Sequence, residues 1–249
     1  MTDLDWQERK TSHGVYIDGA ATHVWLLPCN RTRDALDELY RLLDDTERRR
    51  AQRYHFERDR DRFVAARGAV RRVLAGYLCC DPSEVCFDLT ENGKPHLAAQ
   101  HASSIRFNIS TSCDWSLLAV AHGQEVGIDI ERIDRDRADP AIVDQCFTPA
   151  EARALAGLQG DLWLQGFFNC WSRKEAFVKV TGEGLSRSLQ SFEVTVVPGQ
   201  RASLISVHGY QDAASKWQMS DLAEVPGYAS TLVVAGRINE LYNFRWSPL

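Results

Sequence analysis

The sequence contains no apolar run long enough to span a membrane and no CxxC spacing among its seven cysteines. The first absence argues against membrane insertion, and the second argues against a zinc site or a disulfide framework. The N-terminus, MTDLDWQERK, carries acidic residues where a signal peptide needs a basic start followed by an apolar segment. We therefore expect a cytoplasmic protein with reduced, buried thiols.

The sequence also lacks a net positive charge, since its formal net charge is −5 at pH 7, and this argues against nucleic acid as the main partner. The exception is residues 47–72, an arginine-rich segment that contains no lysine. Such a segment is usually a solvated helical face with interleaved acids, although arginine also makes bidentate contacts with phosphate. The sequence has no P-loop, dinucleotide-binding glycine fingerprint, GxSxG or HExxH motif.

Hydrophobic periodicity and turn residues predict an α+β fold. The order of strands and helices repeats with a break near Gly123, which predicts two halves, residues 1–123 and 124–249. Strands are expected at 22–28, 84–90, 104–110, 115–123, 125–133 and within 191–236, and helices at 31–45, 59–78, 147–158 and 163–180.

The strand EVGIDIERI, residues 125–133, carries two carboxylates on alternate residues. Because successive side chains of a strand point to opposite faces, Asp129 and Glu131 share one face with Gly127. The other face is formed by Val126, Ile128 and Ile130 and is expected to be core. Two acids this close repel each other unless a cation lies between them.

A second informative stretch is CWSRKEAFVKVTGEGLS, residues 170–186, in which Glu175 and Lys179 are spaced to share a helix face with Trp171. A surface ion pair is the ordinary interpretation of this spacing, but the aromatic residues on the same face indicate that it points inward. Together with the acids of the strand, Glu175 would complete an all-oxygen set suited to Mg²⁺ or Mn²⁺. Lys179, one turn further, would face the anion that the metal holds.

The strings VGIDIE, FTPAE and WSRKEAFVKVTGEGL, in this order and spacing, resemble the 4′-phosphopantetheinyl transferases of the broad-specificity, surfactin-synthase-activating type. NGKPH and FNISTS, further upstream, fit the same pattern, and the resemblance covers about residues 22–240. It implies two pseudo-twofold-related α/β halves with the active site in the cleft between them, and a monomer in which one chain supplies both halves.

The resemblance implies that the protein transfers the 4′-phosphopantetheine arm of coenzyme A to a serine of an apo acyl, peptidyl or aryl carrier protein and releases 3′,5′-ADP. Asp129, Glu131 and Glu175 would hold Mg²⁺, with Mn²⁺ as the alternative. Lys179 would neutralise phosphate charge or assist proton transfer. Glu175 is also the candidate for deprotonating the serine, directly or through water.

The resemblance further assigns residues of the first half to coenzyme A. The basic positions are Arg50 and Arg53, the turn and strand contacts are Lys94 and Ser110, and further candidates are Arg62 and His96. Thr111 stands where the family usually has a histidine that touches the phosphates, and threonine offers only a neutral hydroxyl. Activity is still expected, and the substitution bears on coenzyme A affinity.

Two alternatives remain open at this point. The chain could be a carrier-protein-binding module that retains the fold with weakened catalysis, or an unrelated Mg²⁺-dependent nucleotide-binding protein. Glu151 also has two interpretations, because the family has an acid near the site here, whereas Thr-Pro-Ala-Glu is a complete helix capping box. We favour the capping role.

Overall fold

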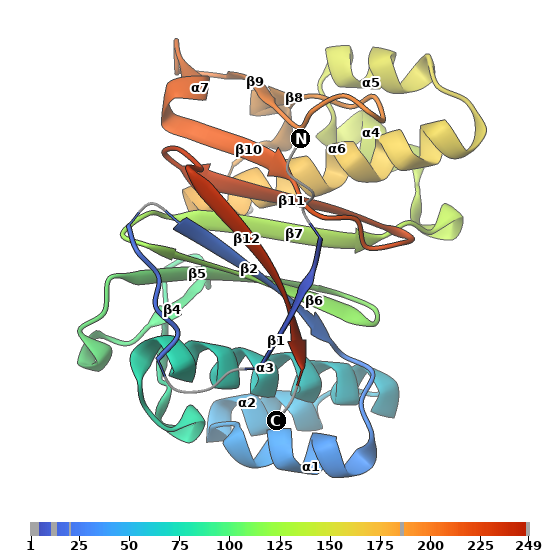
Figure 1. Cartoon of the computed structure of the whole chain (residues 1–249). Coiled ribbons are helices and arrows are strands. Elements are labelled where there is room, and N and C mark those ends of the chain that lie inside the picture. The colour runs from blue at the N-terminus through green and yellow to red at the C-terminus, as the bar shows by residue number, and fades with distance from the viewer. Residues whose placement is uncertain (1–4, 11–13, 20, 185–186, 248–249) are drawn as a thin grey trace.

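Two β-sheets lie face to face between two layers of helices in the computed structural model, which describes residues 5–10, 14–19, 21–184 and 187–247 (Figure 1). The expected α+β class is confirmed. The larger sheet has the order β1 (Gln7–Lys10), β12 (Glu240–Ser247), β2 (Ala21–Pro28), β6 (Trp115–His122) and β5 (Ile105–Ser112), and the smaller has the order β10 (Trp217–Asp221), β11 (Tyr228–Ala235) and β7 (Val126–Arg132).

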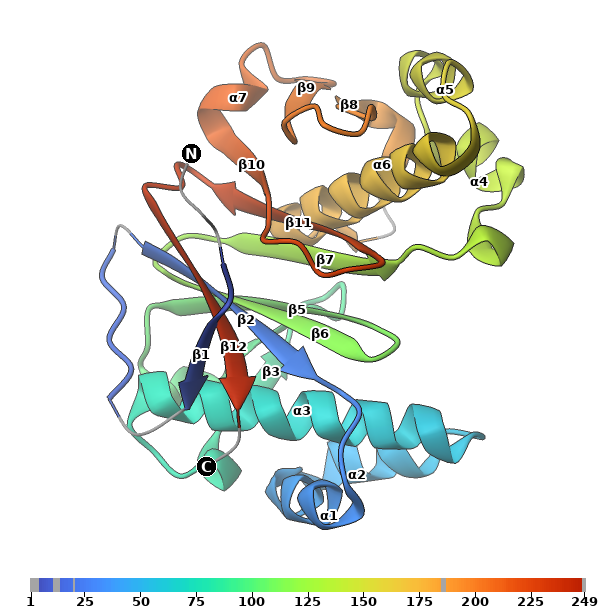
Figure 2. The same cartoon turned by 45° about the vertical axis from the view of Figure 1, so that its right-hand side comes forward.

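Each sheet has its outer face covered by a 22-residue helix (Figure 2). The helix α3 (Glu57–Leu78) packs on β2 and β6, and α6 (Gly160–Thr181) packs on β7 and β11. The remaining helices are α1 (Arg33–Leu42), α2 (Asp45–Gln52), α4 (Pro140–Cys146), α5 (Pro149–Ala156) and α7 (Ala213–Lys216), and the two small hairpins are β3 (Phe87–Leu89) with β4 (Pro95–Leu97) and β8 (Phe192–Val194) with β9 (Leu204–Val207).

Apolar side chains fill the three spaces between the four layers. The strand β7 contributes side chains to two of these spaces, because its successive residues point to opposite faces. Its alternate residues Val126, Ile128 and Ile130 are fully buried between the two sheets, as expected, while the intervening residues face α6. Alternation along a single strand therefore separates the inter-sheet core from the acidic face.

The prediction of one helix over residues 31–45 is wrong, because the chain leaves the helical conformation at Leu43 and begins a new helix, α2, after Asp44. Asp44 and Glu47 form a capping box at this start. Both carboxylates also bind the buried guanidinium of Arg71, at 2.6 and 2.7 Å. A buried charge is costly unless it is paired with an opposite charge. The break in the helix places both carboxylates where they pair with Arg71 of α3.

The predicted division at Gly123 stays a prediction, and the sheets do not follow it at the end of the chain. The strand β12, which lies beyond the strands expected from the sequence, pairs in parallel with β2 of the first half and with β1. The β3–β4 hairpin occupies residues 87–97, so the expected strand over 84–90 is shorter than predicted. Leu185 and Ser186, at the end of the predicted motif, lie outside the described residues.

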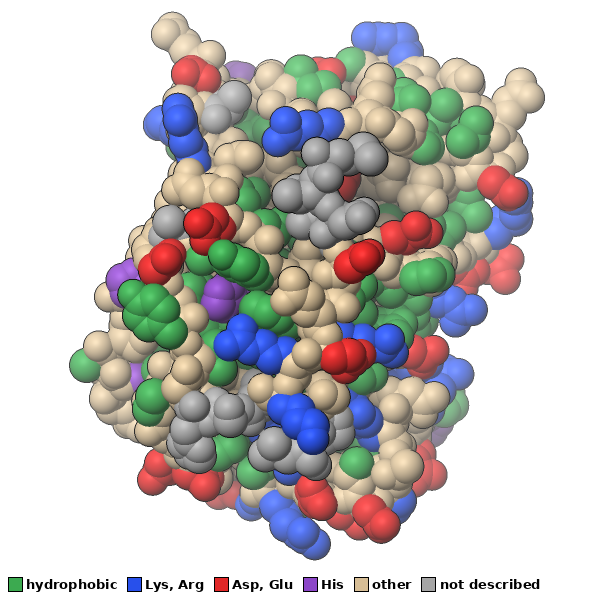
Figure 3. All heavy atoms as spheres, viewed as in Figure 1, with side chains coloured by type: hydrophobic (Ala, Val, Ile, Leu, Met, Phe, Trp, Pro, Cys, Tyr) green, Lys and Arg blue, Asp and Glu red, His purple; other side chains and the backbone are tan. Residues whose placement is uncertain are grey.

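Charged side chains of both signs are interspersed on the face shown in Figure 3. This distribution agrees with the modest net charge of −5. No helix in the described part of the chain is long and apolar enough to cross a membrane.

A buried polar network joins β2 to α3 and includes a histidine. Trp25 donates its indole N–H to the hydroxyl of Tyr77 at 2.8 Å, and that oxygen lies 2.7 Å from Nδ1 of His23. The indole nitrogen can only donate, so the Tyr77 oxygen accepts from it, and its contact with Nδ1 suits either neutral tautomer of the histidine.

Burial, reinforced by the nearby charge of Arg9, lowers the pKa of His23 to about 4. The ordinary value is about 6.5, so below that pH the unfolded chain binds a proton that the folded protein does not. We predict that stability falls by roughly 3 kcal/mol from this group as pH drops from about 6.5 through about 4. Chemical unfolding of wild type and His23→Gln across this range measures the difference.

The control is His122→Gln, which removes an exposed histidine. This variant should keep the wild-type pH dependence, whereas His23→Gln should flatten it. Parallel pH profiles for wild type and His23→Gln would contradict the assignment.

Candidate active site

The edge strands of the two sheets, β5 and β7, are joined by side chains of β5 rather than by a backbone ladder. The side-chain oxygen of Asn108 accepts from the Ile128 N–H at 2.9 Å, and Ser112 Oγ accepts from the Arg132 N–H at 3.0 Å. The opposite edge of β7 pairs with β11. These side chains therefore satisfy backbone groups that would otherwise be open at a buried sheet edge.

The helix α6 comes unusually close to β7 at Gly127. A Cβ atom built at this glycine would lie 2.1 Å from the Ala176 carbonyl oxygen and 2.4 Å from the Val180 nitrogen. No side chain fits in that space, which explains why the acidic face of the strand includes a glycine. The close approach brings the acid and the lysine of α6 next to the acids of β7.

Asp129 is the centre of the cluster and is only 2% exposed. Its Oδ1 accepts from Lys179 Nζ at 2.6 Å and from Ser110 Oγ at 2.8 Å, and Lys179 also donates to Ser110 Oγ at 3.0 Å. Its Oδ2 is buried and has no hydrogen-bond partner among the described residues. The helix spacing had suggested an ion pair between Lys179 and Glu175, but the lysine pairs with Asp129 across the strand instead.

The other two carboxylates are held in an unfavourable electrostatic environment. Burial raises the pKa of Glu131, and the negative charge of Asp129 raises it further. The same two causes, in the same order, raise the pKa of Glu175. Glu131 accepts from Ser112 Oγ at 2.9 Å, whereas no hydrogen bond to the Glu175 carboxylate is found in the described part of the chain.

These three carboxylates fit a hard divalent cation by their chemistry. All the donors are oxygens, one buried oxygen of Asp129 has no hydrogen-bond partner among the described residues, and Lys179 pairs with only one of the three acids, Asp129. Among the described residues, no three His, Cys, Asp or Glu side chains are already arranged as a metal site. The cluster thus has the composition of a magnesium site, and the carboxylates would have to adjust to bind the ion.

Two cavities adjoin the acidic cluster. One, of about 590 Å³, is lined by Glu131 and by arginines of α2 and α3, including Arg50. The other, of about 500 Å³, is lined by Glu175, Lys179 and Lys94. The acids therefore lie between two spaces whose walls carry positive charge, an arrangement suited to a polyanionic ligand.

Arg50 and Arg53, which the sequence assigned to coenzyme A, line a third space of about 440 Å³ together with Arg49 and Tyr54. Arg50 also lines the 590 Å³ cavity and lies over the ring of Phe63. Neither Arg50 nor Arg53 forms an ion pair with a described carboxylate. Their charges are therefore available to a ligand.

Lys94 and His96 lie close in sequence but differ in position. Lys94 donates to Glu125 at 2.9 Å and to the Val126 carbonyl at 3.2 Å, and it lines the cavity beside Lys179. His96 faces a separate space of about 410 Å³ and lines neither cavity at the acidic cluster. The structure therefore brings Lys94 to the cluster and leaves His96 away from it.

Strand alternation separates Ser110 from Thr111. Ser110 faces Asp129, whereas Thr111 points into the 590 Å³ cavity together with Arg50. The Thr111 hydroxyl lies 2.8 Å from Ser116 Oγ. A histidine at this position would thus face the same cavity. Arg62 lines the same cavity and pairs with Asp114 at 2.6 Å.

Glu151 is a structural residue. It completes the capping box with Thr148 at the start of α5 and is 1% exposed. Its carboxylate binds Lys174 Nζ at 2.8 Å and accepts from the Val194 N–H at 2.8 Å. These partners satisfy the buried charge, which supports the capping role over a place in the site.

Sequence reasoning missed the roles of Asn108 and Ser112. Together with Ser110 they occupy alternate positions of the predicted strand, so the signal was a row of small polar side chains on one face of FNISTS. It also missed Arg137, which lines the 590 Å³ cavity from the short 3₁₀ helix Arg135–Arg137. The alternation of β5 could have revealed the first two, whereas the linker sequence gave no signal for the third.

Comparison with known proteins covers both halves of the chain. The model of the 4′-phosphopantetheinyl transferase superfamily matches residues 125–233, and that of the 4′-phosphopantetheinyl transferase N-terminal region matches residues 29–123. The 4′-phosphopantetheinyl transferase HetI of Nostoc sp. is 32% identical over 91% of this chain and 90% of its own length. The transferase Sfp of Bacillus subtilis is 29% identical, over 90% of this chain and 91% of its own.

Among solved structures, this chain is similar to a holo-(acyl-carrier-protein) synthase from Bacillus anthracis in complex with coenzyme A (3′,5′-ADP). The TM-score is 0.37 and the identity 22%, over 44% of this chain and 93% of that one.

The raised pKa of Glu175 leads to a stability prediction. A carboxyl with a raised folded-state pKa stabilises the protein at acidic pH, and that contribution is lost as pH rises through its pKa. Glu175→Gln should therefore raise the Tm of the metal-free protein at neutral pH by a few degrees and leave it unchanged at acidic pH. Differential scanning fluorimetry at both pH values measures this.

The matched control is Glu91→Gln, which removes an exposed carboxylate and should have little effect on Tm. Addition of Mg²⁺ should raise the Tm of wild type more than that of Glu175→Gln. A Tm of Glu175→Gln below that of wild type at neutral pH would count against the unfavourable electrostatics of the cluster.

Proposed function

The chain belongs to the 4′-phosphopantetheinyl transferase superfamily, and we propose that its acidic cluster and the two adjoining cavities carry out that family's reaction. The reaction transfers the 4′-phosphopantetheine arm of coenzyme A to a serine hydroxyl of an apo carrier protein. The serine oxygen bonds to the β-phosphorus as the bond from that phosphorus to the bridging oxygen breaks. The leaving 3′,5′-ADP keeps the bridging oxygen, and the serine proton passes to a base.

Asp129, Glu131 and Glu175 would hold the divalent cation. The observation that carries this proposal is the buried, unpartnered Oδ2 of Asp129 among three carboxylates whose charges repel one another. When bound, Mg²⁺ supplies charge that stabilises negative charge on the transferred phosphoryl group. Carboxylate, water and phosphate oxygens suit both Mg²⁺ and Mn²⁺, so both ions are candidates.

Glu175 is our candidate base. Its carboxylate accepts no hydrogen bond from the described residues and lines the 500 Å³ cavity, so a serine entering there could pass its proton to it directly or through water. Lys179 is already oriented by Asp129 and Ser110. Its ammonium faces the same cavity, where it would bind phosphate oxygens and stabilise the charge that develops on them.

Coenzyme A would bind across the acidic cluster with its nucleotide end in the arginine-lined cavity. Arg50 and Thr111 line that cavity, and Arg53 lines the 440 Å³ space together with Arg50. Neither arginine forms an ion pair with a described carboxylate. To bind a phosphate, Lys94 would have to break its ion pair with Glu125. Arg106, which lies 3.1 Å from Glu125, would still pair with that carboxylate. A monomeric state and a cytoplasmic location stay predictions.

The direct test is a transfer assay. Incubation with coenzyme A, Mg²⁺ and an apo carrier protein should add the mass of one phosphopantetheine arm, and carriers of fatty-acid, polyketide and nonribosomal-peptide origin would define the range. Asp129→Asn should reduce the rate by about a hundredfold or more, because it removes a charge from the ligand set. Asp136→Asn, at an exposed site, is the control.

A chain that binds carrier protein but adds no mass to any carrier would instead be the carrier-binding module with weakened catalysis. Wild-type rates in Asp129→Asn at limiting Mg²⁺ would refute the ligand assignment while leaving the transferase activity intact.

Arg50 should distinguish coenzyme A from its 3′-dephospho form. Its guanidinium forms no ion pair with a described carboxylate and lines the 590 Å³ cavity, in which we place the nucleotide end of coenzyme A. We therefore assign Arg50 to the 3′-phosphate. Arg50→Gln should raise the KM for coenzyme A about tenfold and change that for 3′-dephospho-coenzyme A much less. Equal losses for both substrates would show that Arg50 has only a structural role.

A further inference from the structure

The 590 Å³ cavity contains more positive charge than the resemblance assigned to it. Four arginines line it, and they differ in whether a carboxylate already neutralises them. Arg62 pairs with Asp114 at 2.6 Å, and Arg67 pairs with Glu47 at 2.6 Å. The charges of these two arginines are therefore neutralised by carboxylates of the protein itself. The remaining two are Arg50 and Arg137.

Arg137 is held far less firmly than Arg62 or Arg67. Its only ion pair among the described residues is with Glu131, at 3.9 Å, which is beyond hydrogen-bond distance. Its side chain is 56% exposed, so little desolvation would oppose its movement toward a ligand. When a cation neutralises Glu131, this weak attraction would be reduced further. Arg137 is therefore a guanidinium available to an anion in the cavity.

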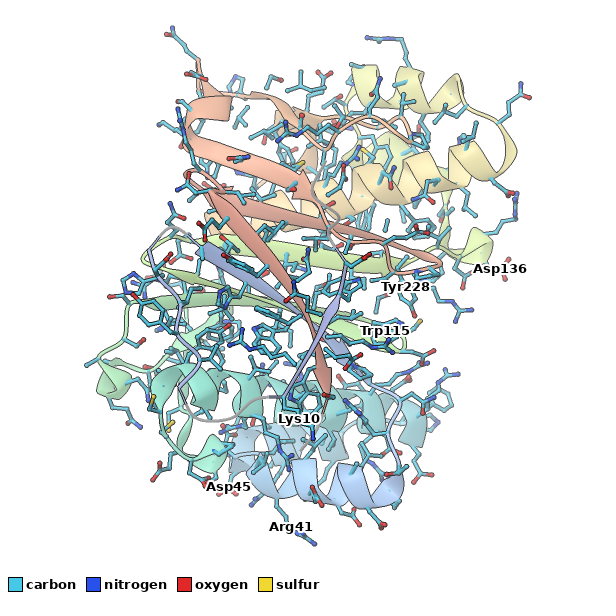
Figure 4. The ribbon with its side chains drawn as sticks, in the orientation of Figure 1. Lys10, Arg41, Asp45, Trp115, Asp136 and Tyr228 are labelled. Atoms are coloured by element: carbon cyan, nitrogen blue, oxygen red, sulfur yellow. The ribbon has the colours of Figure 1, made fainter. Side chains whose placement is uncertain are left out.

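The position of Arg137 is also distinctive, because the other three arginines come from α2 and α3. Arg137 ends a 3₁₀ helix that follows β7, and the Asp134 side chain caps that helix by accepting from the Asp136 N–H. Figure 4 shows the adjacent Asp136 beyond the end of β7. Arg137 thus approaches the cavity from the half that carries the carboxylates.

We propose that Arg137 binds the diphosphate of coenzyme A and supplies, from the second half, the positive charge that position 111 lacks. The inference rests on the proposed function. Because Arg137 lies beside Glu131, an anion that contacts it also lies at the acidic cluster. The diphosphate is the part of coenzyme A that must reach this cluster, since its β-phosphorus is attacked. Guanidinium groups bind phosphate oxygens in bidentate fashion.

The test is calorimetric titration of coenzyme A and 3′-dephospho-coenzyme A into the full chain, without carrier protein. Arg137→Gln should weaken both ligands by about tenfold, because both contain the diphosphate. Arg50→Gln should weaken coenzyme A selectively. Arg137→Lys should retain more affinity than Arg137→Gln, since it keeps the charge but loses the bidentate geometry.

Arg135→Gln is the matched control. It removes the same charge from the same 3₁₀ helix, but Arg135 is 69% exposed, pairs with Asp161 at 3.3 Å and does not line the cavity. Its affinity for both ligands should stay close to that of wild type. Thr111→His in the Arg137→Gln background should recover part of the lost affinity, because the ring returns an N–H donor to the cavity wall.

Three results would overturn the inference. Equal affinities of Arg137→Gln and Arg135→Gln would show that Arg137 does not contact the ligand. A loss for coenzyme A alone would move Arg137 to the 3′-phosphate. Unchanged ligand affinity with a raised KM for carrier protein would place it at the carrier interface. In each case wild type still binds coenzyme A, whereas absence of wild-type binding would refute the proposed function itself.

Discussion

The ion pair between Asp129 and Lys179 is the interaction on which the site depends. One carboxylate oxygen binds an ammonium from α6 and a hydroxyl from β5, so a single atom joins the strand, the helix and the opposite sheet. The pairing is possible only because Gly127 lets α6 approach β7 so closely. The second oxygen is buried and has no hydrogen-bond partner in the described part of the chain, which is costly unless a cation binds there.

The contact between the edge strands β5 and β7 explains why the acidic cluster lies next to the two cavities that are lined by cationic side chains. Alternate residues of β5 bind the edge of β7, and the residue between two of them, Thr111, faces the arginine-lined cavity. One strand of the first half therefore positions the acids of the second and presents a wall to the ligand. Any shift between the sheets would separate the carboxylates from the cavities, so catalysis and the packing of the halves are linked.

Residues governed by strand alternation could be predicted from the sequence, because a period of two leaves only two faces. The shared face of Asp129 and Glu131 and the opposite orientations of Ser110 and Thr111 follow from it. Long-range partners could not be predicted in the same way. Lys179 was expected beside Glu175 from helix spacing, but the nearness of β7 offered it a better partner. The pairing of β12 with β2 likewise depends on tertiary packing that no local pattern encodes.

The proposal to test first is that Asp129 is a ligand of a divalent cation bound between β5, β7 and α6. Electron paramagnetic resonance of free Mn²⁺, titrated with the protein in the presence of 3′,5′-ADP, counts bound ions without any catalytic turnover. The account predicts about one tight Mn²⁺ per chain in wild type and loss of that binding in Asp129→Asn. Mn²⁺ binding of equal stoichiometry and affinity in both proteins would contradict it.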